Sequence, residues 1–330
     1  MVLEKKTVID ISDLSIQLFS SHLNRWFKAV DEINLSVKNN SKLAIVGESG
    51  CGKSITAMSI LKLINANTSK LSGIVKFNGE NLIDLDNKLL GKIRGNRISM
   101  IFQDPMSSLN PVRKIKKLMI EPLLLHTNFS KKEALQISAH LLEQVKIKDP
   151  INCLNSYPHE LSGGMRQRVM IAIALSTKPD LIIADEPTTS LDVSVQKDIL
   201  EIFEDRLNSM GTSTIIISHD ISLVSNFADY ISVMYAGRIV ETGKTSEILS
   251  NPKHPYTLGL IQSTCKIDDR PKSRFQSIPG NPPKLDELPI GCSFQYRCSR
   301  VSEICKKSYP TSSRQTSYHS TSYKCYNPIN

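Results

Sequence analysis

GESGCGKS, residues 47–54, decides the fold class of this chain. It follows the aliphatic run KLAIVG (42–47) and opens a helical pattern, the context in which G-x-x-x-x-G-K-[ST] forms a phosphate-binding loop. Glycines let successive backbone N–H groups point at the β- and γ-phosphates, a lysine adds a point charge, and the last hydroxyl is a Mg²⁺ ligand. The residues expected to bind a nucleotide here are Gly47, Glu48, Ser49, Gly50, Cys51, Gly52, Lys53, Ser54 and Ile55.

Two further aliphatic runs have the same character. LIIADE (181–186) and TIIISH (214–219) are rich in β-branched residues and end in polar turns, as expected for strands covered on both faces of a sheet. Helical patterns lie between the runs. The sequence therefore predicts an α/β fold whose core is a parallel sheet of the P-loop, RecA-like kind.

The remaining segments differ in composition. Residues 8–40 alternate loosely around SSHLN, which predicts short antiparallel strands, and residues 104–178 contain no convincing strand, which predicts a helical insert. Seven of the 16 prolines lie after residue 258, so this part of the chain is expected to be rich in loops. We therefore divide the chain into a nucleotide-binding domain, 1–258, and an extension, 259–330.

Polar residues follow the expected strands at their carboxyl ends, where α/β folds bind ligands. Asp185 is placed to hold Mg²⁺, and Glu186 to orient and deprotonate an attacking water. Gln103 follows a further aliphatic stretch and is placed to contact Mg²⁺ and that water, and His219 is placed to sense the γ-phosphate. Taken alone, Asp185 and Glu186 could instead cap the turn that follows them. A single histidine at a strand end is more often structural than catalytic, so His219 gains its predicted role only from its place at this edge of the sheet.

LSGGMRQR, residues 161–168, has the features of a second anion site. Ser162 can cap the free N–H groups of a helix, and Gly163 and Gly164 permit close approach of the backbone. The helix dipole also favours an anion at this end. A chain with one phosphate loop has no evident use for a second such site of its own.

Together these elements resemble the ATP-binding-cassette (ABC) ATPases. The phosphate loop, Gln103, LSGGMRQR, LIIADEP, SLD (190–192) and His219 occur in the order and approximate spacing of that family, over about residues 7–258. In the family, two cassettes pair head to tail, and the LSGG of each closes over the ATP held by the other. The resemblance implies ATP and Mg²⁺ as ligands.

The resemblance also implies roles that involve a second chain. The residues implied to form the signature that meets the partner's ATP are Leu161, Ser162, Gly163, Gly164 and Gln167. Asp192 would bridge the two cassettes.

Phe19 is expected to stack on adenine, with Trp26 as the alternative because the loop at 20–28 leaves the alignment open.

Three segments near the end of the chain narrow the family. NPKHPYT (251–257), IPGNPPKL (278–285) and GCSFQYRC (291–298) resemble the C-terminal region of the oligopeptide, dipeptide and nickel importer ATPases. This implies an ATP-hydrolysing importer subunit for short peptides, with nickel or another small solute as the runner-up. It also implies a second cassette, for which we prefer a related chain to an identical one, two membrane permease subunits and an extracytoplasmic substrate-binding protein. We expect the permease to contact about 104–125, because that segment lies between Gln103 and the helical insert.

Four of the seven cysteines lie in the last forty residues, at Cys292, Cys298, Cys305 and Cys325. Four thiolates can hold zinc or an iron–sulfur cluster, but C-x5-C-x6-C-x19-C is not one of the tight spacings typical of such sites. The spacing leaves zinc, a cluster and unmetallated thiols open. The family resemblance favours a [4Fe–4S] cluster.

Charge and hydropathy bear on the partners. The net charge is +9, of which residues 259–330 carry +6, so the cassette has too little positive charge for a broad nucleic-acid surface. The alternative is a soluble ABC ATPase acting on ribosomes or nucleic acid, which the basic tail favours and the single cassette and the extension oppose. The chain lacks a run of about 18 apolar residues and a signal-peptide core. We therefore expect a peripheral location on the cytoplasmic face of the membrane, through the permease subunits, and no nucleic acid.

Overall fold

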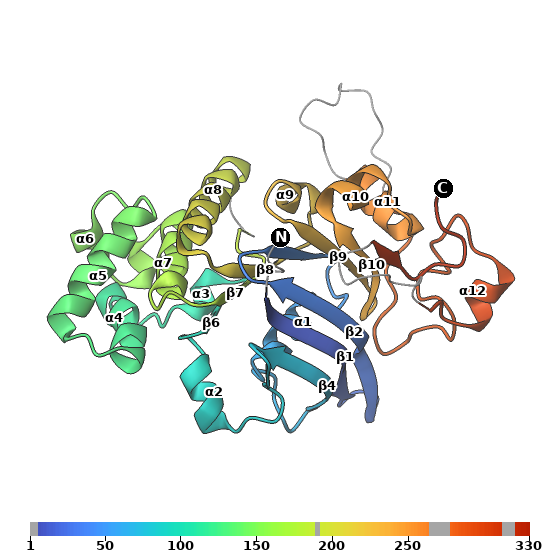
Figure 1. Ribbon diagram of the computed structural model, residues 1–330, viewed down its shortest axis with the longest axis horizontal. Coiled ribbons are helices and arrows are strands. Elements are labelled where there is room, and N and C mark those ends of the chain that lie inside the picture. Colours follow the sequence, from blue (N-terminus) through green and yellow to red (C-terminus); the bar gives the residue numbers. More distant parts are fainter. Residues whose placement is uncertain (1–5, 189–191, 264–277, 312–320) are drawn as a thin grey trace. The chain divides into compact units, whose positions relative to one another are not determined.

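The structure is a computed structural model that describes residues 6–188, 192–263, 278–311 and 321–330 (Figure 1). It contains two compact units. The first includes Lys38–Ser41 and Leu85–Ile216 with the described residues up to Val8, and the second includes Ile9–Val37, Lys42–Asp84 and the described residues after Ile216. The phosphate-binding loop lies in the second unit, whereas the LSGG and LIIADE motifs lie in the first.

An antiparallel sheet near the N-terminus forms one layer of the second unit. Its strand order is β2-β1-β4-β5, with bounds Thr7–Ser20 for β1, Arg25–Lys38 for β2, Ser69–Phe77 for β4 and Glu80–Asn81 for β5. β4 pairs antiparallel with both β1 and β5. Antiparallel strands are therefore confirmed, but the expected shortness is wrong. β1 and β2 have 14 residues each, because the polar SSHLN break forms only the turn between them.

Parallel pairing in the second unit involves the strand before the phosphate loop. β3 (Lys42–Val46) pairs in parallel with β9 (Tyr230–Tyr235), as its continuous aliphatic sequence predicts. β9 forms an antiparallel pair with β10 (Arg238–Lys244), and β10 pairs in turn with β11 (Ser322–Tyr323). The β9–β10 hairpin and β11 were not expected from the sequence.

Short helices complete the second unit, with bounds α1 Lys53–Ile60, α9 Ile221–Ser225, α10 Thr245–Ser250, α11 Pro255–Ser263 and α12 Glu303–Lys307. The expected boundary between residues 258 and 259 falls inside α11. In the described part of the chain beyond α11, α12 and β11 are the regular elements, so a loop-rich extension is confirmed. The extension nevertheless buries side chains, Phe294 and Arg297 among them.

The first unit contains a second part of the parallel core. β6 (Ile98–Ile101) pairs in parallel with β7 (Leu181–Asp185), and β8 (Ser213–Ser218) lies beside β7. All five residues of β7 are buried, which confirms the prediction of a strand covered on both faces. Together with β3 and β9, these pairs confirm the predicted α/β core with parallel strands.

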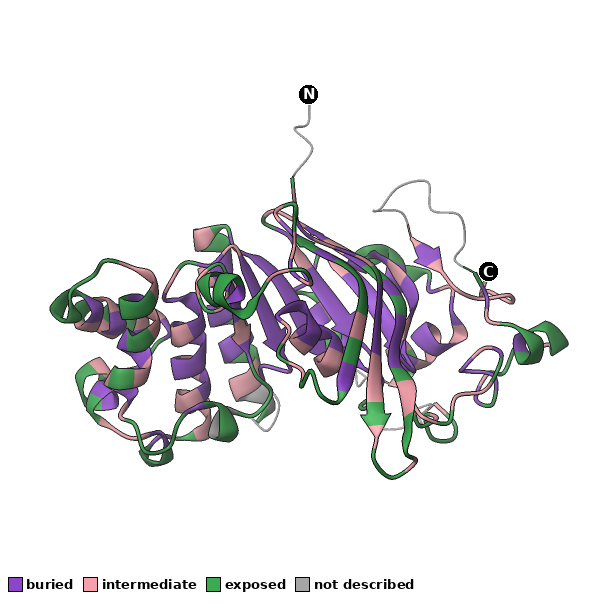
Figure 2. Ribbon diagram, turned by 90° about the horizontal axis from the view of Figure 1, so that it is seen from below, coloured by how far each residue is buried: buried purple, intermediate pink, exposed green. Residues whose placement is uncertain are grey.

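The helical insert is also confirmed. The helices of the first unit are α2 Asn87–Ile93, α3 Pro105–Ser108, α4 Ile115–His126, α5 Lys131–Gln144, α6 Pro150–Asn155, η1 Pro158–Glu160, α7 Gly163–Leu175 and α8 Val193–Met210. α5 begins at a capping box formed by Ser130 and Glu133, and it packs on α4 through Ile120, Leu123 and Ala134. Figure 2 shows strands that are largely buried and helices that are buried on one side and exposed on the other. No helix among the described residues has both the length and the apolar character that crossing a membrane requires.

Candidate nucleotide-binding and catalytic site

The phosphate loop has the backbone that its glycines predict. β3 ends at Val46, the loop follows, and α1 begins at Lys53 with Gly52 as its N-cap at φ 109°. A Cβ on Gly47 would lie 2.2 Å from the carbonyl oxygen of Met234 on β9, so only glycine fits there. The loop is therefore held against a neighbouring strand, and the start of α1 is available to an anion.

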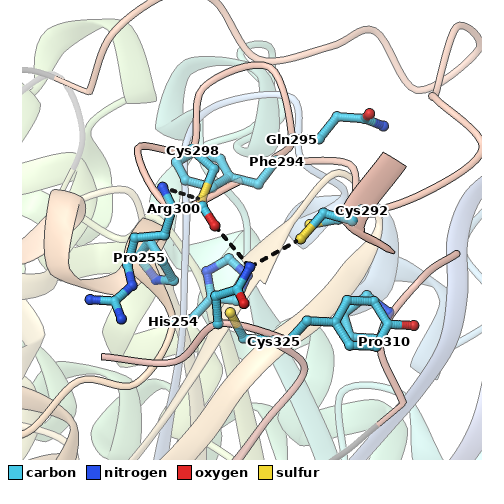
Figure 3. A pocket seen from close by; sticks show the side chains of 12 residues that line it. His254, Pro255, Cys292, Phe294, Gln295, Cys298, Arg300, Pro310 and Cys325 are labelled. Atoms are coloured by element: carbon cyan, nitrogen blue, oxygen red, sulfur yellow. Dashed lines mark hydrogen bonds between the residues drawn. The ribbon is translucent and has the colours of Figure 1, made fainter. Parts of the chain in front are cut away.

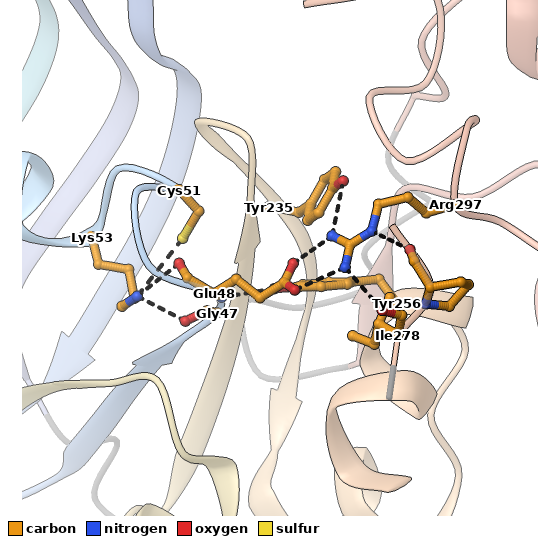
Figure 4. Close-up of polar contacts among 9 residues, drawn as sticks. Gly47, Glu48, Cys51, Lys53, Tyr235, Tyr256, Ile278 and Arg297 are labelled. Atoms are coloured by element: carbon orange, nitrogen blue, oxygen red, sulfur yellow. Dashed lines mark hydrogen bonds and ion pairs between the residues drawn. The ribbon is translucent and has the colours of Figure 1, made fainter. Parts of the chain in front are cut away.

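Lys53 lies at the centre of this loop. Lys53 is buried, and its Nζ donates hydrogen bonds to the carbonyls of Gly47 at 2.7 Å and Glu48 at 3.0 Å (Figure 4). The Sγ of Cys51 lies 4.0 Å from the same Nζ. Burial raises the pKa of the Cys51 thiol, which therefore stays uncharged at neutral pH. The ammonium of Lys53 is thus the charge that the loop directs at a phosphate.

Glu48 links the loop to the extension. Its carboxylate accepts two hydrogen bonds from Arg297, at 2.6 and 2.9 Å, and its backbone N–H donates to the hydroxyl of Tyr256 at 2.8 Å (Figure 4). Sequence reasoning missed Arg297 and Tyr256, although both lie in segments that were quoted as typical of importer ATPases. Because 249 residues separate Glu48 from Arg297, no local spacing could reveal the pair.

The carboxylates of LIIADE occupy the end of β7. Asp185 and Glu186 are 4% and 8% exposed, and Glu186 has a left-handed backbone with φ 47°. The Nε2 of Gln103, just after β6, donates to Oε2 of Glu186 at 2.9 Å. The structure thus brings together two residues that the sequence assigned to the same water. An amide donor at this distance fixes the orientation of the carboxylate.

His219 follows β8 directly, as the sequence predicts, and its side chain is exposed. The next residue, Asp220, caps α9 by accepting from the backbone N–H of Ser222 at 2.8 Å. A strand end followed at once by a capped helix leaves His219 little backbone freedom. Its position is confirmed, and its role as a γ-phosphate sensor stays a prediction.

The LSGG segment opens α7 as a capped helix. Ser162 has an extended backbone, and its Oγ accepts from the N–H of Met165 at 3.3 Å. Leu161 is buried, and Gly163 and Gly164 form the first turn. Gln167 is only 2% exposed, and its Nε2 has no hydrogen-bond partner within the described residues. Gln167 is therefore buried in this chain, and its contact with a partner's ATP stays a prediction.

Two further predictions concern Asp192 and the adenine-stacking ring. Asp192 precedes α8, is exposed, and makes no side-chain capping bond to that helix, while Ser190 and Leu191 lie outside the described residues. Phe19 and Trp26 have ring centroids 5.4 Å apart. Lys70 lies over the ring of Trp26 at 4.2 Å, whereas Phe19 is 36% exposed. Phe19 is therefore exposed and Trp26 is half-buried, and which of the two rings stacks on adenine stays a prediction.

The sequence of the chain matches two family models. One, described as ABC transporter, covers residues 30–189, and the other, described as Oligopeptide/dipeptide transporter, C-terminal region, covers residues 240–305. A probable peptide ABC transporter ATP-binding protein of Sinorhizobium fredii is 44% identical over 304 residues, which are 92% of this chain and 90% of that protein. The chain belongs to the ABC transporter ATP-binding proteins.

Further relatives and solved structures agree with this ABC family assignment. The oligopeptide transport ATP-binding protein OppD of Escherichia coli is 45% identical over 282 residues, 86% of this chain and 83% of OppD. The dimeric structure of the bacterial ABC transporter cassette MJ0796 has a TM-score of 0.64 at 27% identity, and covers 72% of this chain and 98% of that chain. A structure of the same cassette in a post-hydrolysis state with ADP and Pi gives the same values.

This ABC protein therefore couples ATP hydrolysis to transport, and its nucleotide ligand is ATP bound to Mg²⁺. In the second unit, the phosphate loop fits a nucleotide phosphate, with a position at Gly47 that excludes a Cβ and a buried Lys53. In the first unit, the buried carboxylate of Asp185 has the chemistry of a Mg²⁺ ligand. The relatives are named as transport proteins, so the soluble ribosome- or nucleic-acid-acting alternative gains no support.

The cysteines of the ABC protein's extension share one pocket. Cys292, Cys298, Cys305 and Cys325 line it together with His254, although they come from separate segments (Figure 3). None of the four is in a disulfide. Nevertheless, among the described residues no group of three or more His, Cys, Asp or Glu side chains is arranged to hold a metal ion. The four thiols therefore lie around one pocket, but among the described residues their arrangement is not that of a metal centre.

The thiols of this pocket are hydrogen-bonded and hard to ionise. The backbone N–H of Arg300 donates to Cys298 Sγ at 3.4 Å, and Asn327 Nδ2 donates to Cys305 Sγ at 3.5 Å. Burial raises the pKa of both Cys292 and Cys325 to about 11. These two cysteines are therefore neutral thiols at physiological pH.

Proposed function

We propose that the chain is the ATP-hydrolysing subunit of an importer of short peptides. The observation that carries this proposal is the extension, where residues 240–305 match the oligopeptide/dipeptide transporter model beside a full set of ATPase motifs. The peptide-transport names of the relatives support the same cargo. Nickel or another small solute is the second candidate, on the importer resemblance alone.

In this function, the phosphate loop binds the nucleotide, and residues at the strand ends hold the metal and activate the attacking water. Lys53 would bind the β- and γ-phosphates. Ser54 and Asp185 would each offer an oxygen ligand to Mg²⁺, which would neutralise phosphate charge when bound. Glu186 takes a proton from the attacking water, and Gln103 keeps its carboxylate oriented through the 2.9 Å hydrogen bond. His219 contacts the γ-phosphate, and Phe19 stacks on adenine.

The active assembly contains two cassettes. Ser162, Gly163 and Gly164 would bind the γ-phosphate of a partner's ATP at the start of α7, and Asp192 would contact the partner. A related second ATPase chain, two permease subunits and an extracytoplasmic binding protein complete the importer, with this chain at the cytoplasmic face of the membrane. The dimeric form of the similar cassette MJ0796 supports the pairing.

Uptake by cells tests the cargo. A strain that lacks this chain should lose uptake of radiolabelled tripeptides and regain it with the parent gene, but not with Glu186→Gln. Nickel uptake, measured in the same cells, should be unchanged by the deletion. Loss of nickel uptake with normal tripeptide uptake would replace the peptide assignment. Purification of the tagged chain should recover two polytopic membrane proteins and a second cassette.

We further propose, from the importer resemblance, that the four cysteines bind a [4Fe–4S] cluster, with zinc and free thiols as the alternatives. The shared pocket supports this, since four thiols from distant positions line it. Protein purified without oxygen should show iron and a broad absorption near 400 nm that dithionite bleaches. One zinc and no iron would exclude the cluster, and neither metal would leave the pocket as free thiols.

A further inference from the structure

A buried arginine of the extension contacts the nucleotide loop directly. The side chain of Arg297 is 4% exposed and that of Glu48 is 26% exposed, and they form a two-point ion pair with N–O distances of 2.6 and 2.9 Å. Arg297 Nε also donates to the carbonyl of Pro279 at 2.8 Å. The guanidinium therefore joins the second residue of the phosphate loop to two segments of the extension (Figure 4).

The surroundings of Arg297 make this contact rigid. Phe294, three residues earlier, packs against Tyr235 and Tyr256 with ring centroids 5.2 and 5.4 Å apart. The hydroxyl of Tyr235 accepts from Arg297 at 3.4 Å, and that of Tyr256 accepts from the N–H of Glu48 at 2.8 Å. Burial opposes the charge of Arg297, but the Glu48 carboxylate more than offsets this and raises the pKa of the arginine. Both the backbone and the side chain of Glu48 are thus held by the extension.

The chemistry of the loop explains why such a contact matters. Glu48 places a negative charge in a loop that must bind a triphosphate, and an unpaired carboxylate there would repel the ligand. A bidentate arginine neutralises that charge and holds the carboxylate in one direction. The carbonyl of Glu48 meanwhile accepts from Lys53, so displacement of Glu48 would also displace the phosphate-binding ammonium.

We propose that Arg297 is a positioning residue for ATP: through Glu48, it neutralises and holds the phosphate loop and so sets the affinity for the nucleotide. The extension is then part of the ATP-binding apparatus. This role depends on ATP binding, which the family assignment supplies, and not on the cargo. Failure of the peptide proposal would therefore leave the role of Arg297 intact, and the reverse also holds.

The test is a double-mutant cycle on the full chain. MgATP affinity is measured by titration with a fluorescent ATP analogue and competition by ATP, for the parent, Arg297→Met, Glu48→Gln and the double variant. Arg297→Met should weaken binding about tenfold, the range typical of coupling between two groups. In the Glu48→Gln background, where there is no charge to neutralise, the same substitution should change affinity less than about twofold.

Two further variants make the cycle specific. Arg300→Met removes an exposed arginine three residues away and should leave the affinity unchanged. Arg297→Lys keeps the charge but loses the two-point geometry, so its affinity should fall between those of the parent and Arg297→Met. If Arg297→Met does not fold, as judged by its melting curve, the lysine variant in both Glu48 backgrounds supplies the cycle.

Two outcomes would overturn the proposal. An equal loss of affinity with and without the Glu48 carboxylate would show that Arg297 only supports the fold of the extension. An unchanged affinity in a folded Arg297→Met protein would show that the loop needs no help from the extension. Neither outcome depends on which solute the transporter carries.

Discussion

The phosphate loop and the cysteine pocket lie in the same unit, and they relate to the sequence in opposite ways. The loop is built from eight consecutive residues, so its spacing alone predicts its backbone, including the glycine that faces Met234. The pocket gathers four thiols spread over 34 residues, and it places them together without the geometry of a metal site. A contiguous motif specifies geometry, whereas a scattered set of ligands specifies only composition.

The largest expected effect concerns Glu186, which was predicted from another contiguous motif, LIIADE. Glu186→Gln should lower kcat for ATP hydrolysis in the assembled transporter about 10³-fold, because a general base contributes on that order. Binding of MgATP should change less than threefold, since the phosphate loop is intact. Steady-state ATPase assays and equilibrium titration separate the two quantities. Hydrolysis at the parent rate would remove Glu186 from its assigned role.

A smaller but sharper effect is expected from Gly47→Ala. The new Cβ would lie 2.2 Å from a backbone oxygen of β9, which cannot move without disturbing the sheet, so ATP affinity should fall at least about 10²-fold. Gly91→Ala on α2 is the matched control, because its Cβ would meet no atom within 4 Å. The control should bind ATP normally and gain up to about 1 kcal/mol of stability. Normal binding by Gly47→Ala would show that the motif does not dictate the backbone.

The last prediction concerns stability, not ATP, and tests the cysteine pocket through its dependence on pH. The pKa values of Cys292 and Cys325 are about 11 in the folded chain against 9.0 for an unperturbed thiol. The folded state then binds more protons than the unfolded state between these values, so the stability is complete below pH 9 and falls as pH rises through 11. Urea unfolding of the metal-free protein from pH 8 to 11 should show this decline, and a Cys292→Ser, Cys325→Ser double variant should show less of it. An identical decline in both proteins would place the titrating groups elsewhere.

The strands that could be predicted from the sequence are those marked by a short continuous pattern of aliphatic residues. The aliphatic runs predicted at 42–47, 181–186 and 214–219 form β3, β7 and β8, each close to the expected bounds. The β9–β10 hairpin gave no such signal because its turn residues are Ala236 and Gly237, with φ of 46° and 80°. A turn of that kind ordinarily carries Asn-Gly or Asp-Gly, and alanine hides it.

The candidate site divides in the same manner. Gln103 and Glu186 were assigned to one water from their places after aliphatic runs, and the structure joins them by a hydrogen bond. Gln167 shared the LSGG motif but lies buried, because the periodicity of α7 turns it towards the interior. Arg297 and Tyr256 are joined to Glu48 only by the tertiary fold. Such contacts require a structure, since neither partner has a sequence pattern of its own.

The supports of the phosphate loop also order events during synthesis of the chain. The loop lies within the first sixth of the sequence, but Gly47 rests against Met234, and Glu48 is held by Tyr256 and Arg297. A nascent polypeptide that has just emerged from the ribosome with its lysine loop complete still lacks every one of these neighbours. If these contacts set the affinity for ATP, a growing chain acquires tight ATP binding only after Arg297 has been synthesised.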